Sequence, residues 1–331
     1  MLIINIVRRS ILVASTLTLL ALSALIHAQG FDRRDVSVTS QGLKLAAWYY
    51  TPKGLKADEK RPAIVMAHGF SAPKEALLQN FAGPFAEAGF VVLVFDFRYL
   101  GASEGEPRGQ IFPDEQQQDY KNAISWIATQ KEVDAGRIGV WGTSYSGAHV
   151  LNLAAFDRRI KAVVAQVPLV DGLATAQRLN RPDVLPGVIG FLAQDRAQRY
   201  TTGKINYMPV VAPTGQPSIL PTPESFDFFT KVVATSAPRW ENRATIESIE
   251  RFIEYTPAAN IHRISPTPLL IITAEADLLV PTDLTIEAYE RARSPKKLVI
   301  FKGGHFDAYE EPGLKTTQGE ATAWFKQWLM K

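Results

Sequence analysis

The sequence predicts an α/β fold in which helices cover both faces of a mostly parallel, doubly wound sheet. Six short runs of residues are apolar throughout instead of alternating with polar residues, which is typical of parallel strands buried on both faces. Segments with helical periodicity lie between most of these runs. At about 150 residues per domain, 331 residues correspond to two domains or to one large domain with an insertion.

The composition excludes several other classes of protein. Hydrophobic residues make up 46% of the chain and charged residues 21%, which is the balance of a globular protein and not of a disordered, collagen-like or coiled-coil chain. The absence of cysteine excludes disulfide scaffolds, Cys-ligated zinc, iron–sulfur clusters and thiol nucleophiles. The 36 Lys and Arg against 33 Asp and Glu give a net charge of +3 without a long basic run, so we expect no nucleic-acid partner.

The first residues predict a secretory signal peptide over residues 1–28. The pair Arg8-Arg9 precedes an uncharged stretch at 11–26, and Ala28 is the expected last residue before cleavage. A retained membrane anchor is the alternative, because the uncharged stretch at residues 11–26 is nearly as long as the roughly 17 to 20 apolar residues that span a bilayer. The arginine pair resembles a twin-arginine signal, although Val7 stands where Ser or Thr is usual. After cleavage we expect a secreted or periplasmic protein with no stable membrane span.

The expected elements then follow one another as in a doubly wound fold. Residues 36–40 and 43–50 are rich in β-branched and aromatic side chains, and Gln41-Gly42 between them predicts a β-hairpin. The six buried strands are expected at residues 63–67, 91–95, 138–141, 162–166, 269–273 and 297–301. Helices are expected at residues 76–87, 115–129, 148–155, 284–292 and 319–330.

The alternation of strands and helices stops between the fourth and fifth buried strands, where about 100 residues contain no clear strand. Five prolines are crowded into one part of this segment. Because structureless segments of this length are uncommon in compact domains, we expect helices at residues 184–199 and 226–233. The sequence therefore predicts one domain over residues 29–331, interrupted by a helical cap insertion at about residues 170–265.

The strongest indication of chemistry is the segment Ile138–Gly147, in which a strand leads through a glycine-flanked serine into a helix. This is the context of a nucleophile elbow. The serine of such an elbow lies in a strained turn that has space only for small neighbours, and Gly142, Ser146 and Gly147 meet this requirement. We therefore expect Ser144 to be the nucleophile, at the end of a strand where α/β sheets bind ligands. Ser146 is the alternative, but it stands farther past the end of the strand.

A serine hydroxyl needs a neighbouring base, and the base needs a carboxylate to orient it. We expect His305 to be the base, because it lies in a flexible loop directly after the last strand. We expect Asp277 to be the carboxylate, because it follows the strand at residues 269–273. Glu275 is the main rival of Asp277, and Asp307 lies too close to His305 in the sequence to be preferred.

The other four histidines are weaker candidates. His27 is removed with the signal peptide, and His262 carries no motif. His68 follows a strand and is expected to shape the adjacent loop. His149 lies on the helix after the elbow and is expected to serve packing.

Acyl transfer also needs hydrogen-bond donors for the oxyanion that forms on the substrate carbonyl. The backbone N–H of Tyr145, the residue after the expected nucleophile, is the first donor. The second is expected from the turn after the strand at residues 63–67, with Phe70 as the best candidate and Ser71 as the next. Both donors are backbone groups, so composition does not reveal them.

Several motifs together carry a resemblance to a known family. They are His68-Gly69-Phe70, the segment Asp96–Gly105, the elbow with its Gly-x-Ser-Tyr-x-Gly form, Asp277 with Val280-Pro281, and Gly304–Asp307. About half of the chain, from Arg61 to Val167 and from Thr267 to Tyr309, resembles the α/β-hydrolase superfamily, which uses the same chain order of Ser, Asp and His. Within it the chain is similar to the branch of dienelactone hydrolase-like and Xaa-Pro dipeptidyl-peptidase-like enzymes, which are related to cocaine esterase.

This resemblance implies the fold and the triad more firmly than the substrate. The branch cleaves esters, lactones, thioesters, amides and some C–C bonds. The chain differs from dienelactone hydrolases in having Ser where they have Cys, and we expect it to differ from the dipeptidyl peptidases in lacking their large additional domains. For this reason we assign to the chain neither the substrates of dienelactone hydrolases nor those of the dipeptidyl peptidases.

We expect an exported serine hydrolase that cleaves a carboxylic ester or a related acyl bond through Ser144, His305 and Asp277 and an acyl-enzyme. The expected partner is a small-molecule acyl substrate, and no metal or organic cofactor is implied. No feature of the sequence sets an oligomeric state. Aromatic residues of the insertion are expected either to cover the site or to form the core of the cap: Phe191, Tyr207, Phe228, Phe229 and Trp240.

Two other functions remain as alternatives. A peptidase or amidase of the Xaa-Pro dipeptidyl-peptidase-like type generally needs a charged anchor for a free terminus, and Glu241, Glu247 or Glu250 could supply it. A non-catalytic binding protein on a hydrolase scaffold is the hypothesis from another class. The complete set of triad residues in the expected order favours an enzyme over such a binding protein.

Overall fold

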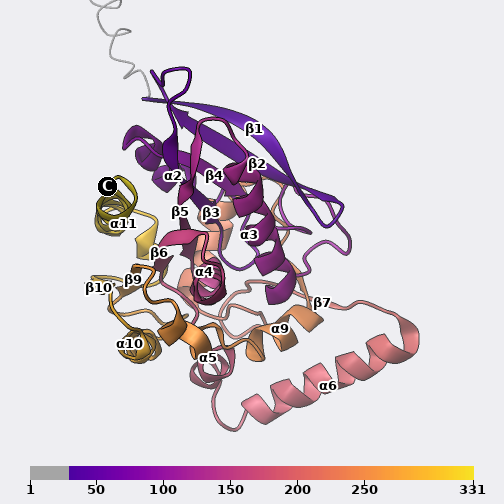
Figure 1. Cartoon of the computed structure of the whole chain (residues 1–331). Coiled ribbons are helices and arrows are strands. Elements are labelled where there is room, and N and C mark those ends of the chain that lie inside the picture. The colour runs from indigo at the N-terminus through magenta and orange to yellow at the C-terminus, as the bar shows by residue number, and fades with distance from the viewer. Residues whose placement is uncertain (1–29) are drawn as a thin grey trace, which may run out of the picture.

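The structure, a computed structural model, describes residues 30–331. These residues form an eight-stranded sheet with helices on both faces (Figure 1). The expected signal peptide, residues 1–28, lies outside the described residues. Within residues 30–331, no helix combines the length and the apolar character needed to cross a lipid bilayer.

The sheet begins with an antiparallel hairpin of β1 (Phe31–Ser40) and β2 (Leu43–Pro52). Its turn residues Gln41 and Gly42 have φ angles of 48° and 85°. Two positive φ angles are the backbone of a type I′ turn, which suits the twist of paired strands. The hairpin predicted from Gln41-Gly42 is confirmed, and both strands extend farther from the turn than predicted.

The other six strands run parallel to one another. The strand order is β1-β2-β4-β3-β5-β6-β9-β10, with β2 antiparallel to β4. Every residue of β4 and β9 is buried, as expected of strands covered on both faces. The predicted mostly parallel, doubly wound sheet is confirmed. The six strands are β3 (Arg61–Ala67), β4 (Val91–Phe95), β5 (Val133–Thr143), β6 (Ile160–Gln166), β9 (Leu269–Ala274) and β10 (Lys296–Phe301).

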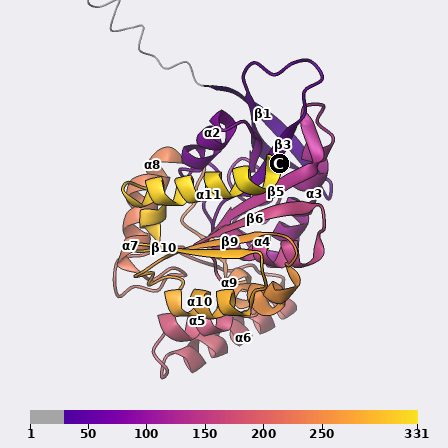
Figure 2. The same cartoon turned by 60° about the vertical axis from the view of Figure 1, so that its left-hand side comes forward.

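Helices α2 (Gln79–Glu87) and α11 (Gly313–Leu329) pack together over the sheet (Figure 2). Helix α2 begins three residues later than predicted, because Leu77 has a φ angle of 64°, which a helix does not accommodate. Helix α11 begins six residues earlier than predicted, because Gly319 faces open space and does not interrupt it.

Helices α3 (Pro113–Ala128) and α4 (Tyr145–Phe156) also pack together against the sheet. Helix α10 (Thr282–Arg291) contacts β9. The predicted helices at these three places are confirmed. Because α4 starts directly after β5, the turn between them sits at the carboxyl end of a central strand.

The segment between β6 and β9 is mostly helical, as predicted. It also contains a pair of two-residue strands, β7 (Tyr207–Met208) and β8 (Ala244–Thr245), where the sequence shows no clear strand. So short a pair leaves no periodic pattern in the sequence, and for this reason it was not predicted. The helices of this insertion are α5 (Gly172–Leu179), α6 (Leu185–Thr202), α7 (Pro223–Asp227), the π-helix η2 (Phe228–Val233), α8 (Ala234–Ser236), α9 (Ile246–Ile253) and the 3₁₀-helix η3 (Pro257–Arg263).

The insertion is packed unevenly. Phe228 and Phe229 of η2 are buried and belong to the same hydrophobic core as the sheet. Helix α6 is the opposite case, since only Leu192 and Asp195 of its 18 residues are buried. Figure 1 shows α6 extending away from the rest of the molecule. One part of the insertion is therefore continuous with the core, and another part meets solvent on most of its surface.

Candidate active site

Ser144 forms the turn between β5 and α4 with a φ angle of 56° and a ψ angle of −115°. A non-glycine residue held there stores about 1 to 3 kcal/mol of strain, which the surrounding structure must offset. A side chain at Gly142 would collide with the backbone carbonyl of Ser146, and one at Gly147 would lie 3.0 Å from Pro168. The small residues around Ser144 therefore have the steric function expected of an elbow.

The hydroxyl of Ser146 has a different environment from that of Ser144. Ser146 is fully buried, donates a hydrogen bond to the carbonyl of Ala67 (2.7 Å) and accepts one from the N–H of Thr143 (2.8 Å). It ties the elbow to β3 and does not line a cavity. Ser144 does line the central cavity, which favours it over Ser146 as the reactive hydroxyl.

Asp277 and His305 are hydrogen-bonded to each other, with 2.8 Å between Oδ2 and Nδ1. Asp277 follows β9 and His305 follows β10, two neighbouring parallel strands whose carboxyl ends lie at one edge of the sheet. Both side chains are buried. The N–H groups of Leu279 and Val280 donate to the other oxygen of Asp277, at 3.0 and 2.8 Å, and fix the carboxylate.

The rival carboxylates lie elsewhere. Glu275 is exposed, although it is only two residues from Asp277. Asp307 accepts a hydrogen bond from the N–H of Gly304 (2.7 Å) and so stabilises the loop that holds His305. Of these three acids, Asp277 is therefore the one that is bonded to the imidazole.

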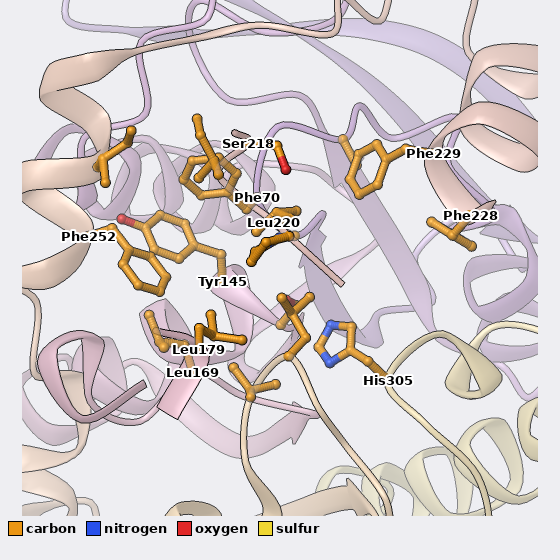
Figure 3. A pocket seen from close by; sticks show the side chains of 18 of the residues that line it. Phe70, Tyr145, Leu169, Leu179, Ser218, Leu220, Phe228, Phe229, Phe252 and His305 are labelled. Atoms are coloured by element: carbon orange, nitrogen blue, oxygen red, sulfur yellow. The ribbon is translucent and has the colours of Figure 1, made fainter. Parts of the chain in front are cut away.

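Ser144 and His305 line the same cavity. Figure 3 shows the imidazole of His305 at its edge. Asp277 engages Nδ1 of His305, which leaves Nε2 as the ring nitrogen available to a reactant. Within residues 30–331 no hydrogen bond joins the Ser144 hydroxyl to this imidazole, and such contacts often shorten only when substrate binds. The three residues singled out from the sequence thus lie at the carboxyl ends of β5, β9 and β10, around one cavity.

The backbone N–H groups of Phe70 and Tyr145 have no hydrogen-bond acceptor within the described part of the chain. The loop of Phe70 touches Ser144, since a Cβ built at Gly69 would lie 3.5 Å from the Ser144 Oγ. The rings of Phe70 and Tyr145 are in edge contact, with centroids 5.3 Å apart. Ser71, the other candidate, has a φ angle of 62° and accepts a hydrogen bond from the Trp240 indole (3.2 Å). Two free donors therefore flank the serine.

Two buried histidines, His68 and His149, lie outside this arrangement. His68 donates through Nδ1 to the carbonyl of Gly69 (2.9 Å) and accepts at Nε2 from the N–H of Phe97 (3.3 Å), so it shapes its loop as expected. Burial lowers its pKa. His149 lies between Gln116 and Tyr255, and burial lowers its pKa to about 3. No three His, Asp or Glu side chains among residues 30–331 are grouped so as to hold a metal ion.

The cavity has a volume of about 440 Å³ and is lined mainly by apolar side chains. Figure 3 shows how Phe70, Tyr145, Leu169 and Phe252 surround the space next to His305. None of its lining residues is Asp, Glu, Lys or Arg. Burying an unpaired charge is costly, so the cavity suits an uncharged and largely apolar group.

Sequence reasoning missed most of this lining. Of the five aromatic residues singled out in the insertion, only Phe228 and Phe229 line the cavity. Phe252 of α9, Leu179 of α5 and Leu220 of the proline-rich stretch line it as well. Their apolar character is visible in the sequence, but nothing in their spacing indicates that separate segments face one space.

Proteins with similar sequences carry names for several activities. The chain is 30% identical over 276 residues to the quorum-quenching protein AidA of Acinetobacter baumannii, covering 83% of this chain and 88% of that protein. It is 31% identical over 283 residues to the polyketide transferase grgF of a Penicillium species, covering 85% and 92%. It is 30% identical over 272 residues to the thiohydrolase aneE of Aspergillus aculeatus, covering 80% and 83%.

Solved structures show the same fold. The crystal structure of the α/β hydrolase GrgF from Penicillium matches with a TM-score of 0.77 at 28% identity, covering 91% of this chain and 100% of that one. A hypothetical protein from Pseudomonas aeruginosa matches with a TM-score of 0.79 at 29% identity, covering 91% and 95%. The predicted α/β-hydrolase fold is thereby confirmed.

The family comparison covers the three candidate catalytic residues. The X-Pro dipeptidyl-peptidase (S15) family matches residues 41–307, which include Ser144, Asp277 and His305. This match confirms the resemblance to the Xaa-Pro dipeptidyl-peptidase-like branch. Together with the sheet topology and the relatives, it shows that the chain is an α/β hydrolase belonging to the X-Pro dipeptidyl-peptidase (S15) family.

Proposed function

We propose that the chain is a serine hydrolase that cleaves an ester, or a related acyl bond such as a thioester, of an uncharged and largely apolar acyl compound. Ser144 attacks the carbonyl carbon while His305 takes the hydroxyl proton, and Asp277 holds the imidazole. The N–H groups of Tyr145 and Phe70 stabilise the oxyanion. His305 returns the proton to the leaving group, and water then releases the acyl group from Ser144 by the same steps.

The observation that carries this proposal is the Asp277–His305 hydrogen bond at the cavity that Ser144 lines. An imidazole oriented through Nδ1 by a buried carboxylate presents Nε2 as a general base. The strained backbone of Ser144 supports the same role, because unfavourable φ angles in non-glycine residues concentrate at active sites.

The uncharged cavity favours an acyl hydrolase over an exopeptidase. A charged anchor for a free amino terminus is not among the residues that line it. Glu241 pairs with Arg243, and Glu247 and Glu250 both pair with Arg199, so the three glutamates proposed as anchors are bound to arginines. The relative named a thiohydrolase supports including thioesters among the substrates to be tested.

A fluorophosphonate probe tests the nucleophile directly. The wild-type chain should be labelled, and Ser144→Ala should not be labelled. Ser146→Ala is the matched control, because it removes a hydroxyl two residues away that lies outside the cavity, and it should keep its labelling if it folds. Labelling of Ser144→Ala equal to that of the wild type would overturn the assignment.

A substrate panel then tests the chemical class. It contains p-nitrophenyl esters of graded acyl length, thioesters, lactones and aminoacyl-prolyl anilides. We expect kcat/KM for the best apolar ester or thioester to exceed that for the anilides by at least about tenfold, because a charged terminus must be desolvated in an apolar cavity. Preference for the anilides would instead support the peptidase.

We also propose that the chain is exported after cleavage behind Ala28, on the basis of the amino-terminal pattern. Mass spectrometry of the protein recovered from a periplasmic or culture fraction should find Gln29 as the first residue. Recovery of the uncleaved chain in the membrane fraction would support the retained anchor instead.

A further inference from the structure

The insertion packs directly onto the loop that holds His305. Phe228 of η2 stacks on Phe306, with ring centroids 4.4 Å apart and an angle of 21° between the rings. One turn earlier in the insertion, the carboxylate of Glu224 lies against Gly304, where a built Cβ would be 2.5 Å from Oε2. The histidine loop is thus held by Asp277 and also by a segment from the insertion.

Glu224 has an unusual position for a carboxylate. Its Oε1 is buried and has no hydrogen-bond partner among the described residues, and no Lys or Arg within residues 30–331 forms an ion pair with it. Burial raises its pKa, and the carboxylates of Asp277 and Asp307 raise it further, whereas His305 lowers it. The protonatable groups that face Glu224 are therefore two acids and one histidine.

Such a carboxylate does little for stability when it is ionised. A surface ion pair or a helix cap would be satisfied by a cation or by N–H groups, but one oxygen of Glu224 has neither. Glu224 lies against Gly304, and the next residue, His305, acquires a positive charge during acyl transfer in the proposed mechanism.

We propose that Glu224 is a positioning residue, which holds the Gly304–His305 segment and supplies a second negative charge to the imidazolium that forms on His305. This inference rests on the proposed function, since it assigns a partner to the base of that reaction. Fixed charges near a developing charge in a buried site act strongly, because little water screens them. The insertion thereby contributes to the catalytic apparatus as well as to the lining of the cavity.

A second contact supports this view of the insertion. The Trp240 indole donates a hydrogen bond to the hydroxyl of Ser71 (3.2 Å), in the loop that also holds Phe70. Trp240 packs against Phe229, with ring centroids 5.2 Å apart. Both loops beside Ser144 are therefore contacted by the same part of the insertion.

The test compares Glu224→Gln and Glu224→Ala with Asp227→Asn. Asp227 is the matched control, because it lies on α7 as well but is exposed and paired with Lys231. For each variant, kcat/KM is measured against pH with an ester that the wild type cleaves, and thermal unfolding is measured at the same pH values.

We expect Glu224→Gln to lose about 5- to 30-fold in kcat, as a charge near the transition state is removed. The acidic limb of its kcat/KM profile should move to lower pH by about half a unit, because the protonated imidazole has lost a favourable charge. Its melting temperature at neutral pH should be equal to that of the wild type or higher. Glu224→Ala should lose more activity than Glu224→Gln, and Asp227→Asn should match the wild type in all three measurements.

Unchanged kcat and an unmoved acidic limb in Glu224→Gln would overturn the proposal. A fall in melting temperature that accounts for the loss of activity would also overturn it, because it would assign Glu224 to folding alone. If the fluorophosphonate probe fails to label the wild type, the proposed function itself is wrong, and this role of Glu224 falls with it. Labelling of the wild type with an unaltered Glu224→Gln profile would reject only the role of Glu224.

Discussion

The sheet and the insertion both line the cavity, but they are built in different ways. The central strands β3, β4, β5, β6 and β9 are buried along most of their length, and Ser144, Asp277 and His305 lie in the short segments that follow β5, β9 and β10. The insertion instead combines a buried part around Phe228 with the exposed helix α6. The difference fits a division in which the proposed reacting groups have a rigid support, whereas the wall of the cavity supplies apolar surface.

This comparison also separates two kinds of evidence for function. The groups on the sheet are defined by hydrogen bonds, such as that between Asp277 and His305, and by the backbone geometry of Ser144. The groups through which the insertion lines the cavity, such as Phe228 and Phe252, contribute apolar packing, while Glu224 and Trp240 contact the loops beside Ser144. Substitutions in the two regions should therefore fail in different ways.

The largest effect is expected from Ser144→Ala, which removes the proposed nucleophile. We expect kcat to fall by about 10⁴-fold or more, with little change in the free energy of unfolding, because the hydroxyl makes no hydrogen bond in the described structure. Ser146→Ala should show the reverse pattern, with a loss of about 1 to 3 kcal/mol of stability, because it leaves the Thr143 N–H and the Ala67 carbonyl without their partner. Urea unfolding and ester hydrolysis of both variants check this pair, and equal stability losses in the two would contradict it.

The next effect is expected in the insertion, where Leu179→Trp places a larger side chain in the cavity. We expect kcat/KM for long acyl esters to fall about 10- to 100-fold, because a bulkier wall excludes methylene groups that the wild type binds, while short esters change little. Leu173→Trp is the matched control, since Leu173 lies on the same helix but is exposed and does not line the cavity. An equal loss for all chain lengths would contradict the role of Leu179 in selectivity.

A smaller effect is expected at the join between the regions, where His149 of α4 bonds to Tyr255 near the end of the insertion. Its pKa is lowered from 6.5 to about 3, so the unfolded chain binds a proton in this range that the folded chain does not. The neutral His149 therefore contributes fully to the free energy of unfolding above pH 6.5. As the pH falls below 6.5, this contribution is lost by up to about 1.4 kcal/mol per pH unit. Denaturation curves between pH 4 and 7 should show a shallower pH dependence for His149→Gln than for the wild type, and an identical dependence would count against this assignment.

The smallest effect is expected from Ile189→Ser on α6, where the side chain is 44% exposed. Stability should change by less than about 0.5 kcal/mol, since an exposed substitution removes little buried surface. Leu192→Ala on the same helix, at a buried position, should cost about 2 kcal/mol or more. Thermal unfolding measures the stability of both variants. Equal losses of stability in the two would contradict the uneven packing of α6.

Most of the sheet could be predicted from the sequence, because the apolar pattern of a buried strand lies within a few consecutive residues. The segment at residues 91–95 is apolar throughout, and β4 has the same bounds. The start of α2 was less predictable, since the positive φ angle of Leu77 depends on the surrounding packing and not on the residue type. The strands β7 and β8 were not predicted, because a strand of two residues is too short to show a periodic pattern.

The candidate site was predictable to a similar extent. Ser144, Asp277 and His305 stand out because each follows a strand, and parallel strands bring their carboxyl ends to one edge. Asp277 was preferred to its rival Glu275, and the structure has Asp277 buried and bonded to the imidazole while Glu275 is exposed. The walls of the cavity were mostly missed, since they come from segments that are distant in the sequence.

The sequence by itself determined the order of strands and helices, the elbow around Ser144 and the absence of a thiol nucleophile. These features follow from residue types over a few neighbouring positions, where sterics and periodicity act. Only the tertiary structure decided that Ser146 bonds to Ala67, that the cavity contains no charged side chain, and that Glu224 faces the loop of His305. Ser146 and Ala67 are 79 positions apart and meet because β5 pairs with β3. Glu224 meets Gly304, and the walls of the cavity come together, only when the insertion packs on the sheet.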